Sequence, residues 1–306
     1  MTDYRLLTYQ TAKGPRAGLL VGETVYDAAE LTAHPADATV LAILDDWQNA
    51  SVRLGRAASC AQPQQGQNLS KVRLRTPILY PNTIYCAGAN YKDHAAEMAR
   101  LFNRKMEPDP HEQGLKCFMF LKAGRTAVDP DATITVTPYS KALDWELELA
   151  AVIGRKATAV TEETALDYVA GYTIANDLSA RDFARRPHIA DASPFKADWA
   201  SSKNFDHSCP LGPWITPASQ IGDPQNLAMK LTINGVTKQE SNSGQMIFNI
   251  REQIAHLSSR ITLYPGDVIL TGTPAGVGAA RNEFLKAGDV VVLTIERIGA
   301  LKTTIA

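Results

Sequence analysis

The residues best suited to chemistry lie in an acidic stretch, Leu143–Leu149, in which acidic and apolar side chains alternate. A period of two predicts a β-strand, because successive side chains of a strand point to opposite faces. Glu146 and Glu148 would then share one face at a spacing of roughly 7 Å, with Asp144 on the same side. Carboxylates this close need a cation or water between them. The alternative is a strand with one solvated face, but the apolar continuation over residues 150–153 favours a buried strand.

A third acid follows another predicted strand. The apolar run at residues 172–175 predicts a buried strand, and Asp177 comes at its end. Three carboxylates without a neighbouring His or Cys are hard oxygen ligands, which favour Mg²⁺, Mn²⁺ or Ca²⁺ over zinc. Glu146, Glu148 and Asp177 are therefore candidate metal ligands. The alternative for Asp177 is the N-cap of a helix that begins near Ser179.

A histidine and a glutamate share one face of a predicted helix at about residues 91–102. His94 and Glu97 are three positions apart and therefore neighbours on the helix surface. The carboxylate can hold one imidazole nitrogen and leave the other to take a proton from water, which is the arrangement of a general base. The alternative is an ordinary surface pair.

A glycine-rich loop follows a predicted strand at residues 269–278. It lacks the Gly-Lys-Ser/Thr ending of a phosphate-binding loop and is not followed by a helical pattern, so it is no dinucleotide fingerprint either. Glycine lets a backbone approach a small ligand closely, and Thr273 offers a hydroxyl group. The alternative is a tight turn between two strands.

The elements that must position these residues are mostly strands. Up to about residue 58 the pattern predicts a small β-meander (residues 5–9, 17–21 and a brief third strand) with helices within residues 39–56. The polar, Pro/Gly/Gln-rich residues 59–68 predict a linker. We therefore expect a small amino-terminal domain at residues 1–72 and a catalytic domain at residues 73–306.

The second part of the chain is rich in turn signals between strands. Asn234-Gly235 is the clearest hairpin signal, and helices are expected at residues 162–169 and 246–260. Neither a fixed-period repeat nor strict βαβ alternation occurs. These absences disfavour a solenoid, a Rossmann sheet and a TIM barrel, and leave a mixed, mostly β domain.

Composition excludes several classes of function. The 306 residues are 45% hydrophobic and 21% charged, with a formal net charge of -1 and no dense run of Lys or Arg, so a nucleic-acid partner is not expected. Apolar runs are far shorter than the roughly 20 residues of a membrane span. The first residues lack the pattern of an export signal, which makes the cytoplasm the expected location. Four scattered cysteines without a CxxC pair predict reduced thiols.

Six short motifs, in order from about Asn82 to the carboxyl end, resemble the fumarylacetoacetate hydrolase family and in particular its bacterial acylpyruvate hydrolase and 2-hydroxyhepta-2,4-diene-1,7-dioate isomerase members. The motifs are residues 86–91 with His94 and Glu97, residues 118–122, 144–149, 171–182, 203–213 and 265–274. The resemblance implies an α+β, mostly β chain with a β-roll-like catalytic domain and a small amino-terminal α+β domain. It also implies a homodimer.

The same resemblance assigns roles to individual residues. It implies Mg²⁺ or Mn²⁺, or Ca²⁺ in a crystal, held by Glu146, Glu148 and Asp177. It makes His94, activated by Glu97, the base that acts on water. The remaining roles are binding or polarising the substrate near the metal for Lys203, and substrate contacts for Tyr91, Lys122, Arg181 and Thr273.

The implied chemistry is hydrolysis of a C–C bond in an acylpyruvate-like 1,3-diketo acid, a small-molecule substrate that chelates the metal through adjacent oxygens. The metal polarises a carbonyl and stabilises the enolate that leaves after water attack. The same site also suits isomerisation or decarboxylation of a related 2-oxo diacid, such as oxaloacetate or 2-hydroxyhepta-2,4-diene-1,7-dioate. His94 with Glu97 favours hydrolysis, because a decarboxylase has less need of a base that acts on water. A non-catalytic protein that kept the fold would not need the intact set of acids.

The chain also departs from the family pattern. Many members carry a glutamine at the position of Ala184, so one substrate contact is missing here. Arg185, Arg186 and His188 follow and could recognise a second carboxylate or form a solvated turn. Residues 103–116 look longer than the usual lid connection, and we expect them to shape substrate access and to become ordered on binding.

Overall fold

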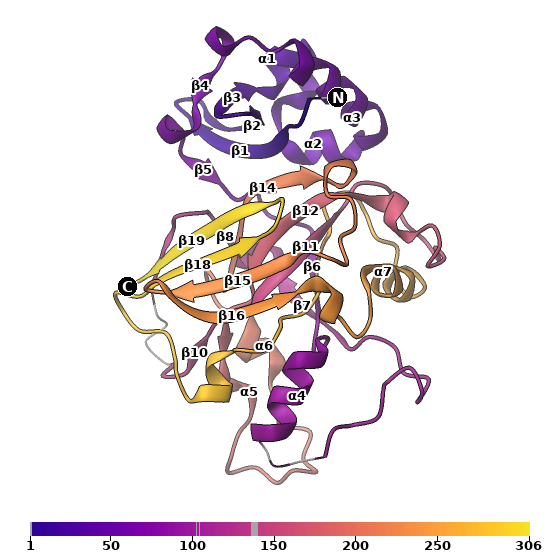
Figure 1. Cartoon of the computed structure of the whole chain (residues 1–306), viewed down its shortest axis with the longest axis vertical. Coiled ribbons are helices and arrows are strands. Elements are labelled where there is room, and N and C mark those ends of the chain that lie inside the picture. The colour runs from indigo at the N-terminus through magenta and orange to yellow at the C-terminus, as the bar shows by residue number, and fades with distance from the viewer. Residues whose placement is uncertain (1, 102, 104, 136–139) are drawn as a thin grey trace.

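The computed structural model describes residues 2–101, 103, 105–135 and 140–306 (Figure 1). Within these residues the chain forms seven α-helices: α1 Ala28–Thr32, α2 Val40–Asp45, α3 Trp47–Cys60, α4 Lys92–Leu101, α5 Arg181–Ala184, α6 Trp199–Lys203 and α7 Ile250–Ser258. No helix among the described residues is long and apolar enough to span a membrane.

The strands of the described residues form a twelve-stranded sheet, a five-stranded sheet and a separate pair. Their bounds are β1 Arg5–Thr11, β2 Gly14–Val21, β3 Thr24–Asp27, β4 Gln67–Asn68, β5 Leu74–Arg75, β6 Thr83–Ala87, β7 Met119–Ala123, β8 Ala127–Val128, β9 Thr133–Ile134, β10 Leu143–Asp144, β11 Leu147–Ile153, β12 Val169–Asn176, β13 Ser179–Ala180, β14 Cys209–Pro217, β15 Ala228–Ile233, β16 Val236–Asn242, β17 Val268–Leu270, β18 Val290–Ile295 and β19 Gly299–Ile305. The predicted α+β, mostly β fold class is confirmed.

The amino-terminal part of the chain is the predicted meander. Strands β1, β2 and β3 pair antiparallel, and helices α1 to α3 pack beside them at one end of the molecule (Figure 1). The predicted linker at residues 59–68 is wrong, because α3 continues to Cys60 and β4 pairs with β3. Strand β1 also pairs with β14, so the sheet runs on into the rest of the chain. The domain boundary after residue 72 stays a prediction.

The centre of the large sheet is the run β14-β12-β11-β17-β6-β7. Every residue of β11 and β12 is buried, as expected for strands covered on both faces. Alternate side chains of β11 enter two different cores, with Leu147 and Leu149 on one face and Ala150 and Val152 on the other. Glu148 lies between Leu147 and Leu149 in the sequence and therefore shares the face of Ala150.

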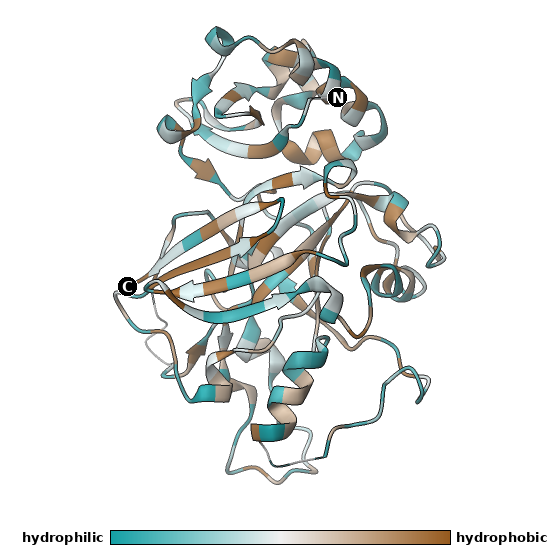
Figure 2. Cartoon of the chain, viewed as in Figure 1, coloured by the Kyte–Doolittle hydropathy of each residue, from teal (hydrophilic) through white to brown (hydrophobic). Residues whose placement is uncertain are grey.

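The five-stranded sheet has the order β16-β15-β18-β19-β9. Its first turn is the predicted Asn234-Gly235 hairpin, in which both residues have a positive φ and Ile233 pairs with Val236. Figure 2 shows mostly hydrophobic residues along β18, in the middle of this sheet, and mostly hydrophilic ones along the edge strand β16. A polar edge discourages pairing with strands of other molecules.

Two predicted helices differ from the structure. The helix expected at residues 162–169 is wrong: residues Ala165–Tyr168 form one 3₁₀ turn, and Val169 already begins β12. The helix expected at residues 246–260 is shorter, because Asn249 caps α7 by accepting hydrogen bonds from the next turn. All four cysteines are free thiols, as predicted.

Candidate metal centre

The acidic stretch does not form the single strand that its alternation predicts. Strand β10 ends at Asp144 and β11 begins at Leu147, so Trp145 and Glu146 lie between two strands. The chain breaks here because β10 pairs with β13, whereas β11 pairs with β12. The prediction of one continuous strand is therefore wrong, but Asp144 and Glu146 still share a partner, because Arg181 donates from Nε to Asp144 and from Nη2 to Glu146. The Asp144 carboxylate also accepts hydrogen bonds from the backbone N–H groups of Gly278 and Ala279.

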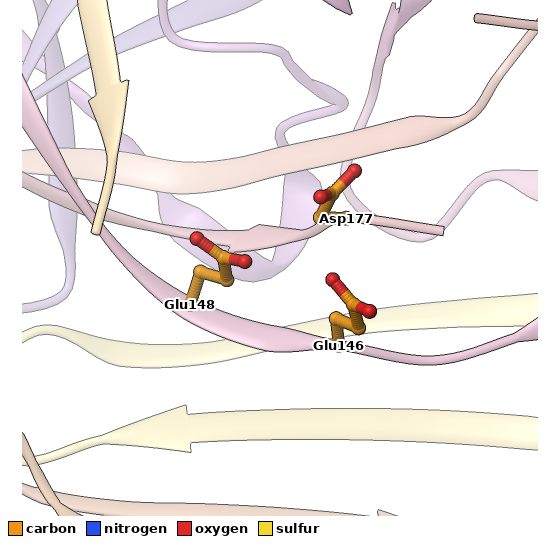
Figure 3. Close-up of side chains that lie close together, drawn as sticks. All are labelled: Glu146, Glu148 and Asp177. Atoms are coloured by element: carbon orange, nitrogen blue, oxygen red, sulfur yellow. The ribbon is translucent and has the colours of Figure 1, made fainter. Parts of the chain in front are cut away.

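The other three predicted acids meet at one point (Figure 3). One carboxylate oxygen from each of Glu146, Glu148 and Asp177 lies within 4.8 Å of those of the other two. All three side chains are buried, with exposed fractions of 6%, 1% and 0%. Glu146 directly precedes β11, Glu148 is its second residue, and Asp177 follows the end of the antiparallel partner β12. The Glu146 N–H donates to Asn176 Oδ1 at 3.0 Å and fixes this register.

Three cationic side chains surround the acids. Lys203 Nζ lies 2.7 Å from Glu146 Oε2 and 2.6 Å from Asp177 Oδ2. Lys122 Nζ lies 2.8 Å from Asp177 Oδ1, and Arg181 forms an ion pair with Glu146. Burial raises the pKa of Glu146, but the charges of Lys203 and Arg181 outweigh it and hold this pKa below the ordinary value. The negative charges of Glu146 and Asp177 are therefore balanced by the positive charges of neighbouring side chains.

Glu148 forms no ion pair with any residue that the structure describes. Its Oε2 accepts a hydrogen bond from the Gly272 N–H at 2.7 Å. Burial, then the charges of Asp177 and Glu146, raise the pKa of Glu148 well above its ordinary value. A buried carboxylate beside two other acids calls for a further positive charge, and a donor set made only of carboxylate oxygens fits a hard divalent cation. The residues present thus fit Mg²⁺ or Mn²⁺.

His94 and Glu97 lie on α4 as predicted, although residue 102, the expected end of that helix, is outside the described residues. His94 Nδ1 is 3.4 Å from Glu97 Oε2. Both Glu97 oxygens accept from the Gly276 N–H, at 2.9 and 3.1 Å. Burial raises the pKa of Glu97, but the bonds from His94 and Gly276 lower it overall, so the carboxylate stays charged. The side chains of His94 and Glu97 are both mostly buried.

The two remaining predicted contacts are held by other partners. Thr273 Oγ1 is buried and accepts from Gln239 Nε2 at 2.9 Å. The Tyr91 hydroxyl is directed at Met229 Sδ, 3.3 Å away in the core, and burial raises its pKa well above the ordinary value. Tyr91 therefore belongs to the same core as Met229, and its hydroxyl has a partner other than the carboxylates.

Sequence reasoning missed the amides that hold the site together. Gln239 Oε1 accepts from the Leu147 N–H at 3.0 Å, while its Nε2 donates to Thr273 and Pro274. Asn90 Nδ2 donates to the backbone oxygens of Phe248 and Thr271. Asn90 belongs to the motif at residues 86–91, so the sequence did mark it as a residue of interest. Nothing in the polar sequence around Gln239 distinguishes that residue.

The basic residues after α5 serve the loop that contains them. Arg186 forms an ion pair with Asp198 and donates to the Phe195 carbonyl oxygen. Arg185 Nη2 lies 3.6 Å from Asp191. These contacts stabilise a loop, and recognition of a second carboxylate by this group, His188 included, stays a prediction.

The predicted insertion at residues 103–116, of which residue 104 lies outside the described part, lines an open cleft of about 610 Å³ together with α4. His111 anchors this segment: its Nδ1 is 2.8 Å from Asp109 Oδ1, and its Nε2 is 2.7 Å from Glu252 Oε1 on α7. The ring also packs against Phe248 at a centroid distance of 4.6 Å. Two carboxylates thus hold one imidazole.

We expect the pKa of His111 to lie above its ordinary value, because the hydrogen bonds to Asp109 and Glu252 favour the charged ring. The stabilisation is fully present below the unfolded-state pKa of about 6.5 and is lost as the pH rises through the higher folded-state value. An NMR titration of the imidazole signals measures this pKa. The pKa should fall in Asp109→Asn and stay constant in Glu240→Gln, whose carboxylate pairs with Lys230. An unchanged titration in Asp109→Asn would contradict the anchor.

Comparison with known proteins identifies one matching family and several similar enzymes. A family described as fumarylacetoacetate (FAA) hydrolase C-terminal matches residues 83–306. A Xenopus laevis protein named oxaloacetate tautomerase fahd2, mitochondrial, is 41% identical over 238 residues, which cover 77% of this chain and 69% of the relative. A 2,4-didehydro-3-deoxy-L-rhamnonate hydrolase from Sphingomonas sp. is 37% identical over 237 residues, or 76% of each chain.

Solved structures match almost the whole chain. Fumarylacetoacetate hydrolase from Exiguobacterium antarcticum superimposes with a TM-score of 0.78 at 27% identity and covers 99% of both chains. Maleylpyruvate hydrolase from Sphingobium sp. SYK-6, in complex with manganese(II) ion and pyruvate, has a TM-score of 0.75 at 28% identity and covers 99% of this chain and 98% of its own.

Proposed function

This chain belongs to the fumarylacetoacetate hydrolase family, and from that premise we propose that it is a divalent-metal-dependent hydrolase of acylpyruvate-like 1,3-diketo acids. One observation carries the proposal: three buried carboxylates meet at one point, beside the buried ammonium group of Lys203. Pyruvate in the complex of the maleylpyruvate hydrolase supports a 2-oxo acid as the product.

Glu146, Glu148 and Asp177 would hold Mg²⁺ or Mn²⁺, and the manganese of the related structure supports that choice. When bound, the cation supplies positive charge for the oxygens of the diketo acid and for the enolate that leaves. Lys203 is a buried ammonium group that would bind a carboxylate or keto oxygen of the substrate. Lys122 donates to Asp177 and to the backbone oxygens of Leu178 and Lys203, so it would hold Asp177 in place.

His94 would act as the general base. Glu97 holds its Nδ1, so Nε2 can take a proton from a water molecule. The resulting hydroxide attacks the acyl carbonyl carbon, the C–C bond to the pyruvate part breaks, and its electron pair stays on that part as an enolate. Protonation of the enolate carbon then gives pyruvate, and the acyl part leaves as a carboxylic acid.

The second candidate is isomerisation or tautomerisation of a 2-oxo diacid, with decarboxylation as a variant. It is favoured by relatives named oxaloacetate tautomerase and by a solved 2-hydroxyhepta-2,4-diene-1,7-dioate isomerase from Mycobacterium marinum at 30% identity. These reactions need the same stabilised enolate but no attack by water.

Product analysis by ¹³C NMR separates the candidates. Acetylpyruvate with purified protein and Mg²⁺ should give pyruvate and acetate, and a sample with excess chelator should not. With oxaloacetate, faster keto–enol exchange without loss of substrate would indicate the tautomerase, and release of carbon dioxide would indicate the decarboxylase. Acetylpyruvate that stays intact while oxaloacetate reacts would contradict the hydrolase proposal. The homodimer and the cytoplasmic location stay predictions.

A further inference from the structure

Residues 275–279 form a loop that contacts both the acidic stretch and helix α4. On the α4 side, the backbone of the loop holds two carboxylates. The Gly276 N–H donates to both oxygens of Glu97, and the Ala275 N–H donates to Asp93 Oδ1 at 3.3 Å. The position of Glu97, and with it that of His94, therefore depends on where this loop lies.

On the other side, the same loop is held by the two residues that precede Glu146. Trp145 Nε1 donates to the Gly276 carbonyl oxygen at 3.0 Å. Asp144 accepts from the N–H groups of Gly278 at 2.6 Å and Ala279 at 3.0 Å. Both side chains are buried, with exposed fractions of 1% and 0%, so water does not compete for these bonds.

Packing leaves the loop little freedom to shift. Gly276 has φ +101°, which other residues rarely adopt, and a Cβ there would collide with the carbonyl oxygen of Lys238 on β16. A Cβ on Gly278 would lie 2.6 Å from Asp144 Oδ1. The loop thus packs closely between β16 and the acidic stretch. The carbonyl oxygen of Gly276 accepts from Trp145, and its N–H donates to Glu97.

We infer that Trp145 and Asp144 are positioning residues that set the His94–Glu97 pair relative to the carboxylates through the backbone of residues 275–279. Neither side chain belongs to the predicted site. The assignment of His94 as base rests on the proposed function, whereas the mechanical link between Trp145 and α4 does not. Because Glu146 follows Trp145 directly, one short segment supplies a metal ligand and also fixes the base.

The first test is Trp145→Phe, which keeps the aromatic bulk and removes the N–H that reaches Gly276. We expect kcat to fall by about 10- to 100-fold, the range that a misplaced catalytic group produces. Mn²⁺ affinity and KM should change less than about threefold, because the three carboxylates remain. Trp214→Phe is the matched control: it removes an indole N–H that donates to the Ile298 carbonyl oxygen, away from the carboxylates, and should leave kcat unchanged.

Amide hydrogen exchange provides a readout that does not need turnover. In Trp145→Phe the amides of α4 should exchange faster, while those of β11 and β12 keep their protection. Asp144→Asn is a second variant for the exchange measurement alone, because the new amide nitrogen cannot accept from Ala279, and the amides of α4 should again exchange faster. Its turnover is not used, since Asp144 also accepts from Arg181, which forms an ion pair with Glu146.

A double variant tests whether Trp145 acts on His94 through Gly276 and Glu97. If Trp145 acts through Gly276 and Glu97, then Trp145→Phe should lower kcat much less in a Glu97→Gln background than in the natural chain. Unchanged α4 exchange in both Trp145→Phe and Asp144→Asn would overturn the inference. If α4 exchanges faster in these variants but the natural protein turns over none of the substrates, the link between Trp145 and α4 stands and only the proposed function is rejected.

Discussion

His94→Ala is expected to lower kcat for acylpyruvate hydrolysis by about 10²- to 10⁴-fold, the usual contribution of a general base, while Mn²⁺ still binds. The reason is positional: His94 belongs to α4 and is no candidate ligand, so its loss leaves the oxygens of Glu146, Glu148 and Asp177 in place. Pyruvate release measures kcat, and isothermal titration with Mn²⁺ measures the affinity.

The control for this variant is His256→Ala, which removes an imidazole from the last turn of α7. It should keep the natural rate. Glu97→Gln should have a smaller effect than His94→Ala, because the amide oxygen can still accept from the ring or from Gly276. Normal hydrolysis by His94→Ala would show that His94 is not the general base and would favour the tautomerase over the hydrolase as the function.

The sequence located these groups wherever one local rule sufficed. Helical spacing brought His94 and Glu97 to one face, and the end of a buried strand marked Asp177. Alternation also placed Glu146 and Glu148 close together, but it did not predict that the strand ends at Asp144. The two-residue β10 pairs with β13, and a partner 35 residues along the chain leaves no trace in the local period. Long-range pairing therefore decides where a strand begins and ends.

The side-chain amides that hold the site could not be predicted from the sequence for the same reason. Gln239 connects β16 to Leu147, across 92 positions, and Asn176 holds Glu146 across 30. Such bonds exist only once the strands are assembled. One missed boundary, in contrast, was available: Asn249 and Glu252 form a capping box, a pattern that places the start of α7 at Ile250.

The second large effect is expected for Glu148→Ala, which should abolish Mn²⁺ binding while the fold is retained. Glu148 is the acid without a cationic partner among the described residues, so it should depend most on the metal. In the natural protein a cation at about 100 times its Kd adds about 2.7 kcal/mol to the free energy of unfolding, and this gain should vanish in the variant. Thermal unfolding with and without Mn²⁺ measures it, and undiminished affinity would contradict the site.

Glu148→Gln separates the charge of this residue from its volume. The amide keeps an oxygen for the Gly272 N–H and fills the same space, so the metal-free variant should be at least as stable as the natural chain near neutral pH. It should still lose the metal-dependent gain in stability, because a neutral amide is a poor replacement for a carboxylate ligand. In the natural chain, the pKa of Glu148 is raised by burial and by Asp177 and Glu146, so protons compete for its oxygens. Its Mn²⁺ affinity should therefore weaken as the pH falls, and a pH-independent affinity would show that Glu148 is not a ligand.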